Sequence, residues 1–149
     1  MRIALCSDEK YPVHDTIRRV LAERGHEVVP FGAVRTGSDV PWADAAEEAA
    51  IAVASGACDE GVFLCWTGTG IAMAANKVPG IRAALCFDPG GAAGARIWNH
   101  ANVLCLSNRW LSDDMAKEIL ASWLDTDPGE KGSDGVARLA AVDARQRRS

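Results

Sequence analysis

The sequence predicts an α/β fold in which residues 1–149 form a single domain: a five-stranded parallel sheet between two layers of helices. Short apolar runs alternate along the chain with longer segments whose apolar residues recur at helical spacing. The short runs are apolar over most of their length, as expected of strands buried on both faces of a parallel sheet. With 149 residues, 48% of them hydrophobic, the chain is long enough to bury such a core.

The predicted strands are apolar runs that end at polar or turn-forming residues. The first begins directly after the initial methionine and ends at Ser7, and the third ends at Cys65, just before a turn rich in glycine and threonine. We expect strands at residues 2–7, 26–31, 61–65, 81–86 and 102–106.

The first two helices are marked by proline near their starts and glycine after their ends. Pro12 suits the first turn of a helix at residues 14–24, which Gly25 ends. Pro41 begins a long alanine-rich helix that ends at Ser55 and Gly56.

The later helices differ in how clearly the sequence marks them. A short helix at 69–77 ends before Pro79, and one at 88–98 is weakened by three glycines. Ser112 suits the N-cap of a helix that runs to about Leu124. The remaining segments are a last helix at 136–147 and polar loops at 32–40 and 125–135.

Composition excludes several classes of function. The net charge is −4 and no basic stripe dominates, which argues against a nucleic-acid partner. No apolar run is long enough to span a membrane, and the N-terminus does not resemble a signal peptide. Five cysteines, an odd number, indicate free thiols in a reducing cytoplasm. The three histidines have no ligand spacing with the cysteines, so we expect neither a metal nor a cofactor.

The segment 65–70 is the strongest candidate site, because ligands of parallel α/β sheets bind at the carboxyl ends of the strands. Cys65 is either a catalytic base or nucleophile, or a buried structural thiol. Thr67 either moves a proton or stabilises the turn. Gly68, Thr69 and Gly70 form either an anion-binding nest or a tight turn without a ligand; the pattern matches neither a P-loop nor a dinucleotide fingerprint.

Three residues beside other strand ends have equally open roles. Asp8 follows the first strand, where it either faces a ligand or caps a helix. His100 precedes the fifth strand and is either a site residue or a surface histidine. Arg109 follows the fifth strand and either binds an anion or is solvated.

Three motifs carry a resemblance to a known family. The segments 65–77 (CWTGTGIAMAANK), 80–86 (GIRAALC) and 99–104 (NHANVL) resemble the type B ribose-5-phosphate isomerases, a family that includes galactose-6-phosphate isomerase subunits. The resemblance implies a Rossmann-like three-layer αβα sandwich, a homodimer with an active site shared between subunits, and metal-independent aldose–ketose isomerisation. It also implies a role as base for Cys65, proton movement by Thr67, and an oxyanion held by the backbone of residues 68–70. Substrate binding by Asp8, Asn99 and Arg109 is implied in the same way.

The sequence departs from the family pattern at substrate-contacting positions. Trp66 replaces a glycine, Glu9 replaces a histidine, Trp98 stands at the ring-opening histidine, and His100 stands at an aspartate. The first of two phosphate-binding arginines falls on Asp134, and the second corresponds to Arg138. A carboxylate in place of a guanidinium opposes phosphate binding.

We therefore expect a small sugar or sugar phosphate other than ribose 5-phosphate as substrate, for example a tetrose phosphate. Trp66 and Trp98 would narrow the pocket, and His100 would replace the missing ring-opening histidine. The alternative is a catalytically impaired sugar- or nucleotide-binding protein of the same fold.

Overall fold

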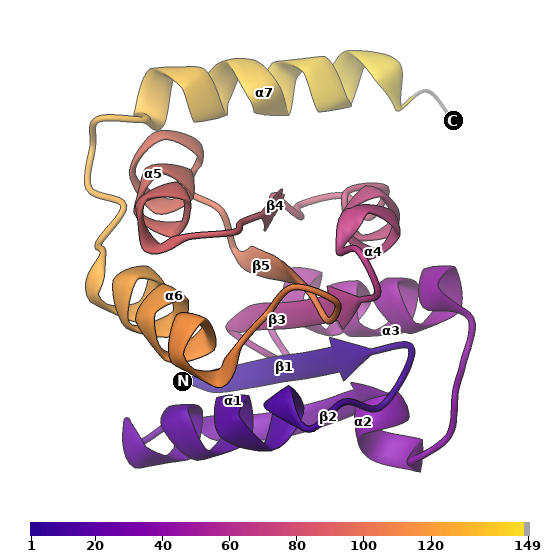
Figure 1. Ribbon diagram of the computed structural model, residues 1–149. Coiled ribbons are helices and arrows are strands. Elements are labelled where there is room, and N and C mark those ends of the chain that lie inside the picture. The colour runs from indigo at the N-terminus through magenta and orange to yellow at the C-terminus, as the bar shows by residue number, and fades with distance from the viewer. Residues whose placement is uncertain (148–149) are drawn as a thin grey trace.

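The computed structural model describes residues 1–147 and contains a five-stranded, fully parallel sheet in the order β2-β1-β3-β5-β4 (Figure 1). The predicted three-layer α/β sandwich is therefore confirmed. The strands are β1 (Arg2–Ser7), β2 (Glu27–Gly32), β3 (Glu60–Cys65), β4 (Ala83–Leu85) and β5 (Val103–Ser107).

Helices cover both faces of this sheet. One face packs against α1 (Val13–Glu23), α5 (Pro89–Asn99) and α6 (Asp113–Asp125), and the other against α3 (Trp42–Ala54) and α4 (Thr69–Ala75). Alternate residues of each central strand enter the two cores: in β1, Ile3 and Leu5 face the first group, whereas Ala4 and Cys6 face the second. The apolar runs of the sequence follow from this burial on both faces.

The strand order places a topological switch point between β1 and β3. From β1 the chain passes to β2 on one side, and β3 then pairs with β1 on the other side. The loops that follow β1 and β3 therefore diverge, and in sheets of this kind ligands bind at such a point. Ser7 of β1 pairs with Leu64 of β3, so that the next residues, Asp8 and Cys65, come side by side at this edge.

The largest departures from the predicted elements concern the loop at 32–40, strand β4 and the last helix. A one-turn helix, α2 (Ala33–Thr36), lies within the predicted loop at 32–40. Strand β4 has three residues, not six: at its amino end the N–H of Arg82 donates to the side chain of Asn102. The Asn76 side chain bonds both the N–H and the carbonyl of Ala83.

The last helix, α7 (Ser133–Gln146), begins three residues before the predicted start and lies beyond β4, at the top of Figure 1. The chain enters it through Gly132, where a Cβ atom would lie 2.5 Å from the carbonyl oxygens of Ile97 and Trp98. None of its residues is buried, and Leu139 and Val142 are exposed. Among the described residues, no helix is long and apolar enough to cross a membrane.

Candidate active site

Cys65 ends β3 at the switch point, but its thiol is enclosed. Its exposed fraction is 5%, and it belongs to the apolar cluster that includes Cys6, Phe63 and Ile71. Strand alternation directs this side chain towards α3 and α4, so the thiol is buried in the isolated chain. The Cys65 carbonyl accepts a hydrogen bond from the N–H of Asn108 at 2.9 Å, which fixes the end of the strand.

The other four cysteines are buried thiols that are poorly suited to act as a base. Burial raises the pKa of Cys6, Cys58 and Cys105, and raises that of Cys86 to about 11. All five cysteines are free. Among them, Cys65 alone directly precedes the turn at the switch point.

The turn after Cys65 has a backbone that requires glycine. Gly68 has a φ of +81°, and a Cβ atom there would lie 2.5 Å from Leu85 Cδ1 and 3.0 Å from the Leu106 carbonyl oxygen. At Gly70, a Cβ atom would lie 3.1 Å from the ring of Trp42, a residue for which the sequence offered no signal. No side chain caps the first turn of the seven-residue α4, so the predicted anion-binding role of residues 68–70 stays a prediction.

Two hydroxyl groups of this turn are paired. Thr67 Oγ1 and Thr69 Oγ1 lie 2.7 Å apart, within hydrogen-bond distance. Because each hydroxyl can donate or accept, the pair can pass a proton between two oxygen atoms of a ligand. The geometry is compatible with proton movement by Thr67, and it equally stabilises the turn.

Asp8 presents an unsatisfied carboxylate beside this turn. Its exposed fraction is 9%, and among the described residues Oδ1 has no hydrogen-bond partner. Burial raises the pKa of Asp8, and the neighbouring carboxylates of Glu9 and Asp39 raise it further. Such a buried acceptor is costly unless a ligand supplies a donor, which a sugar hydroxyl would do.

Glu9 is held locally. Its carboxylate accepts a hydrogen bond from the hydroxyl of Tyr11 at 3.2 Å, and its carbonyl accepts one from Ser7 Oγ at 2.6 Å. The residue is half-buried.

A buried polar network, which sequence reasoning missed, supports the loop after β1. His14 Nε2 donates to Asn108 Oδ1 at 2.8 Å, and Asn108 Nδ2 donates to Ser7 Oγ at 3.1 Å. His14 Nδ1 accepts from the N–H of Tyr11, which assigns the proton to Nε2. Burial lowers the pKa of His14, so the neutral ring is favoured.

The predicted anion-binding residue Arg109 lies between two tryptophan rings. Its guanidinium carbon is 4.5 Å from the ring centroid of Trp66 and 5.1 Å from that of Trp110. The Arg109 N–H donates to the carbonyl of Trp66 at 3.0 Å, so the loops after β3 and β5 are joined directly.

The remaining predicted site residues are not brought to Cys65 within one chain. Trp98, Asn99 and His100 end α5 just before β5, at the amino edge of the sheet. The length of β3 between Gly61, which pairs with Val103, and Cys65 is about 13 Å at the usual rise of a strand. His100 adopts a φ of 45°, and its Nε2 is buried without a partner among the described residues.

Arg138 is also remote from the switch point. It lies on α7, exposed, where its Nε donates to Asp134 Oδ2 at 3.0 Å. Arg138, for which the resemblance implies phosphate binding, is thus paired with the carboxylate of Asp134.

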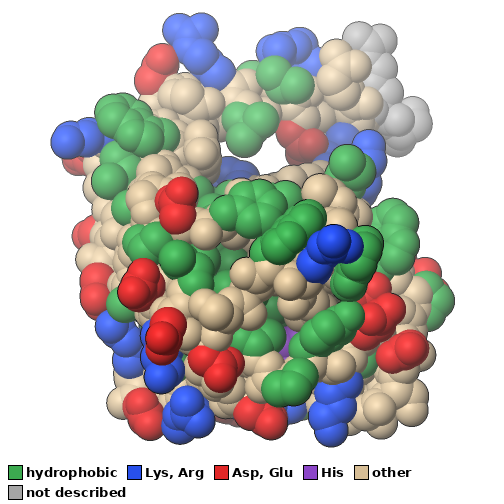
Figure 2. Space-filling view, in the orientation of Figure 1, with side chains coloured by type: hydrophobic (Ala, Val, Ile, Leu, Met, Phe, Trp, Pro, Cys, Tyr) green, Lys and Arg blue, Asp and Glu red, His purple; other side chains and the backbone are tan. Residues whose placement is uncertain are grey.

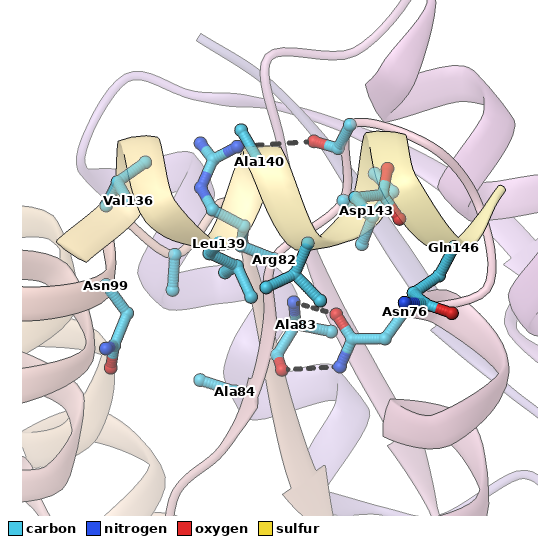
Figure 3. A pocket seen from close by; sticks show the side chains of 14 residues that line it. Asn76, Arg82, Ala83, Ala84, Asn99, Val136, Leu139, Ala140, Asp143 and Gln146 are labelled. Atoms are coloured by element: carbon cyan, nitrogen blue, oxygen red, sulfur yellow. Dashed lines mark hydrogen bonds between the residues drawn. The ribbon is translucent and has the colours of Figure 1, made fainter.

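A cavity of about 510 Å³ lies between α7 and the β4 edge of the sheet, and Figure 2 shows the hollow beneath α7. Asn99, Arg82 and Leu139 are among its lining residues, as Figure 3 shows, whereas Cys65, Thr67 and Asp8 are not. Within residues 1–147, no group of three His, Cys, Asp or Glu side chains is placed to hold a metal ion.

Comparison with known proteins identifies the family. A family model described as Ribose/Galactose Isomerase matches residues 3–141. A D-erythrulose-4-phosphate isomerase from Pectobacterium atrosepticum is 39% identical over 113 residues, 76% of this chain and 74% of that protein. Ribose-5-phosphate isomerase B from Escherichia coli is 36% identical over 127 residues, 85% of each chain.

A solved structure of ribose-5-phosphate isomerase B from Clostridium thermocellum matches with a TM-score of 0.90 at 37% identity, and covers 97% of this chain and 99% of that chain. The similarity therefore includes both the sheet and the segment after α6. The chain belongs to the ribose/galactose isomerase family, whose members are aldose–ketose isomerases of sugar phosphates.

Proposed function

We propose that this enzyme interconverts the aldose and ketose forms of a four-carbon sugar phosphate. The observation that carries the proposal is the meeting of Asp8, Cys65 and Thr67 at the switch point of a family fold, while Trp98 occupies the position of the ring-opening histidine. A tetrose esterified at O4 cannot close a furanose ring, so its isomerisation needs no ring-opening acid. The similarity to an erythrulose-4-phosphate isomerase supports the same substrate class.

In this mechanism the Cys65 sulfur removes the proton from C2 of the aldose. The C–H electron pair forms the C1–C2 double bond of an enediolate, whose negative charge rests on O1. A proton then moves from O2 to O1 through the Thr67–Thr69 hydroxyl pair, and the Cys65 thiol gives its proton to C1, which yields the ketose and regenerates the base. Backbone N–H groups of residues 68–70 stabilise the oxyanion, and Asp8 Oδ1 accepts a hydrogen bond from a substrate hydroxyl.

Substrate reaches the sulfur through the turn that follows it. Trp66 is half-exposed and Thr67 is partly exposed, whereas only a small fraction of Cys65 is accessible. A shift of the residues 66–70 on substrate binding would therefore uncover the thiol, as loop movements do in many enzymes.

We further propose that the active form is a homodimer in the cytoplasm. The amino-edge residues Trp98, Asn99 and His100, together with Arg138 on α7, can join a Cys65 site only if they come from a neighbouring subunit. The short edge strand β4 and the exposed apolar side chains of α7 offer surface for that contact. Five free thiols suit a reducing compartment.

The substrate test is a kinetic comparison of tetrose 4-phosphates with ribose 5-phosphate. We expect kcat/KM to be larger for the tetrose phosphates by an order of magnitude or more, since the two indoles narrow the site. Efficient turnover of ribose 5-phosphate would contradict the substrate assignment. Binding of sugars without turnover of any of them would instead support the binding-protein alternative.

The shared site is tested by mixing two inactive variants, Cys65→Ala and Asn99→Ala. If each site takes Cys65 from one subunit and Asn99 from the other, mixed dimers contain one intact site and regain up to about half of the activity per dimer. A mixture that stays inactive after subunit exchange, shown by differently tagged chains, would contradict a site that takes Cys65 from one subunit and Asn99 from the other.

A further inference from the structure

Three large aromatic side chains are exposed on three loops at the carboxyl ends of neighbouring strands. Trp66 follows β3 with an exposed fraction of 49%, Phe87 follows β4, and Trp110 follows β5 with an exposed fraction of 60%. Phe87 meets Trp110 edge-on, with the ring centroids 6.3 Å apart. An exposed aromatic group of this size is uncommon on a monomer surface and usually has a function.

The rings of Trp66 and Trp110 flank one cation. The guanidinium of Arg109 lies over both, at 4.5 Å and 5.1 Å from the ring centroids. Each contact lies within the range of an attractive cation–π interaction, and Arg is the cation that most often makes one. Between two rings, the side chain of Arg109 has far fewer rotamers available than a solvated arginine has.

The cation is held without being neutralised. Arg24, Arg35 and Arg96 each form an ion pair with a carboxylate. In the part of the chain that the structure describes, Arg109 forms no such pair. An aromatic face attracts the charge but accepts no strong hydrogen bond, so the N–H donors of the guanidinium remain available to an anion.

The backbone of Arg109 is hydrogen-bonded to the residue that follows Cys65. The Trp66 carbonyl accepts hydrogen bonds from the N–H of Arg109 at 3.0 Å and from Ser107 Oγ at 2.8 Å. The preceding carbonyl along the chain, that of Cys65, accepts one from the N–H of Asn108 at 2.9 Å. The backbone of Arg109 therefore keeps a fixed distance from the residue proposed to remove the proton.

We propose that Trp66 and Trp110 are positioning residues that hold Arg109 ready for the terminal oxyanion of the substrate. The proposal rests on the proposed function, and it explains how this chain selects a substrate that is charged and short. Since the ordering of Arg109 precedes binding, less conformational entropy is lost when the anion arrives. Because the backbone of Arg109 is bonded to that of Trp66 and its guanidinium contacts two rings, the distance between the charge and the reacting carbon is restricted.

The test compares Trp110→Leu and Trp66→Leu with the conservative variant Trp110→Phe. For the leucine variants we expect KM for a tetrose 4-phosphate to rise about fivefold or more, with a smaller change in kcat. The ratio of kcat/KM for the phosphorylated tetrose to that for the uncharged tetrose should fall by a similar factor. Trp110→Phe keeps an aromatic face and should restore most of the loss. Arg24→Gln, which removes a remote arginine paired with Asp125, is the matched control and should leave KM unchanged.

Binding of inorganic phosphate, measured by isothermal titration calorimetry, tests whether Trp66 and Trp110 hold Arg109 in position, and it requires no turnover. We expect the wild type to bind phosphate and the leucine variants to bind it about fivefold more weakly. If the tetrose assignment is wrong, turnover fails while this difference in phosphate affinity persists. Equal phosphate affinity in wild type and leucine variants, no phosphate binding by the wild type, or an equal loss for charged and uncharged tetroses would each overturn the proposal. Circular dichroism of each variant checks that it is folded, and the two leucine positions provide independent tests.

Discussion

Replacing Gly68 by alanine tests the structure of the turn at the switch point. The φ of +81° alone disfavours a residue with a Cβ atom by about 1–2 kcal/mol. The added methyl group would lie 2.5 Å from Leu85 Cδ1 and 3.0 Å from the backbone of Leu106, and relieving such an overlap costs about 1–3 kcal/mol more. We therefore expect Gly68→Ala to lower the free energy of unfolding by about 2–5 kcal/mol.

Gly56→Ala is the matched control, because Gly56 has a φ of +83° but an added Cβ atom there would meet no other atom within 4 Å. Urea denaturation of both variants separates backbone strain from steric overlap, and Gly56→Ala should show the strain alone. The activity of Gly68→Ala should fall as well, since the displaced turn carries Thr67 and follows Cys65. Equal destabilisation by the two substitutions would refute the close packing of this turn.

Three further substitutions test the surroundings of the site. Burial lowers the pKa of His14 in the folded protein, while Asn108 and Asp15 oppose the shift and Arg18 adds to it. The stability that neutral His14 contributes is therefore complete above its unfolded pKa of about 6.5 and is lost as the pH falls through its folded pKa. In urea denaturation, the free energy of unfolding should fall from pH 7 to pH 5 more steeply for the wild type than for His14→Gln. The two slopes should differ by at most about 1.4 kcal/mol per pH unit, and identical slopes would contradict this expectation. Glu60 forms an ion pair with Arg96 at 2.9 Å and accepts a hydrogen bond from Trp123 at 2.9 Å. Glu60→Gln should therefore lower the free energy of unfolding by about 3 kcal/mol in the same assay, because it leaves the Arg96 cation without a carboxylate partner, and a loss as small as that of Arg24→Gln would argue against this. Asp8→Asn should raise KM about tenfold with the fold intact, because its NH₂ group can present a donor where the substrate hydroxyl needs an acceptor. An unchanged KM would show that Asp8 does not bind the substrate.

Periodicity and turn chemistry were sufficient to predict most of the fold. The central strands β1, β3 and β5 have continuous apolar runs because both of their faces are buried, and the predicted ranges agree with them to within one residue. The edge strand β4 was predicted too long, since at its amino end the N–H of Arg82 donates to the side chain of Asn102, a contact that no apolar pattern reveals. The early start of α7 depends on the packing of Gly132 against the end of α5, a tertiary contact.

The candidate site was predictable to the extent that topology determines it. Asp8 and Cys65 meet because parallel strands end at one edge, which follows from the order of the elements. The contact between His14 and Asn108 joins residues 94 positions apart, and the partnership of Trp110 with Arg109 depends on side-chain directions, so neither has a signal in the sequence. The enclosure of the Cys65 thiol was likewise invisible in a pattern that showed only the end of a strand.

The central claim is that the Cys65 sulfur removes a proton bound to carbon. Its most direct test is NMR measurement of deuterium incorporation at C2 of a tetrose 4-phosphate incubated with the enzyme in D₂O. The account predicts exchange with the wild type and with Cys58→Ala, which lacks a buried thiol elsewhere in the fold, and a loss of at least a hundredfold with Cys65→Ala. Exchange at the wild-type rate in Cys65→Ala would contradict the account.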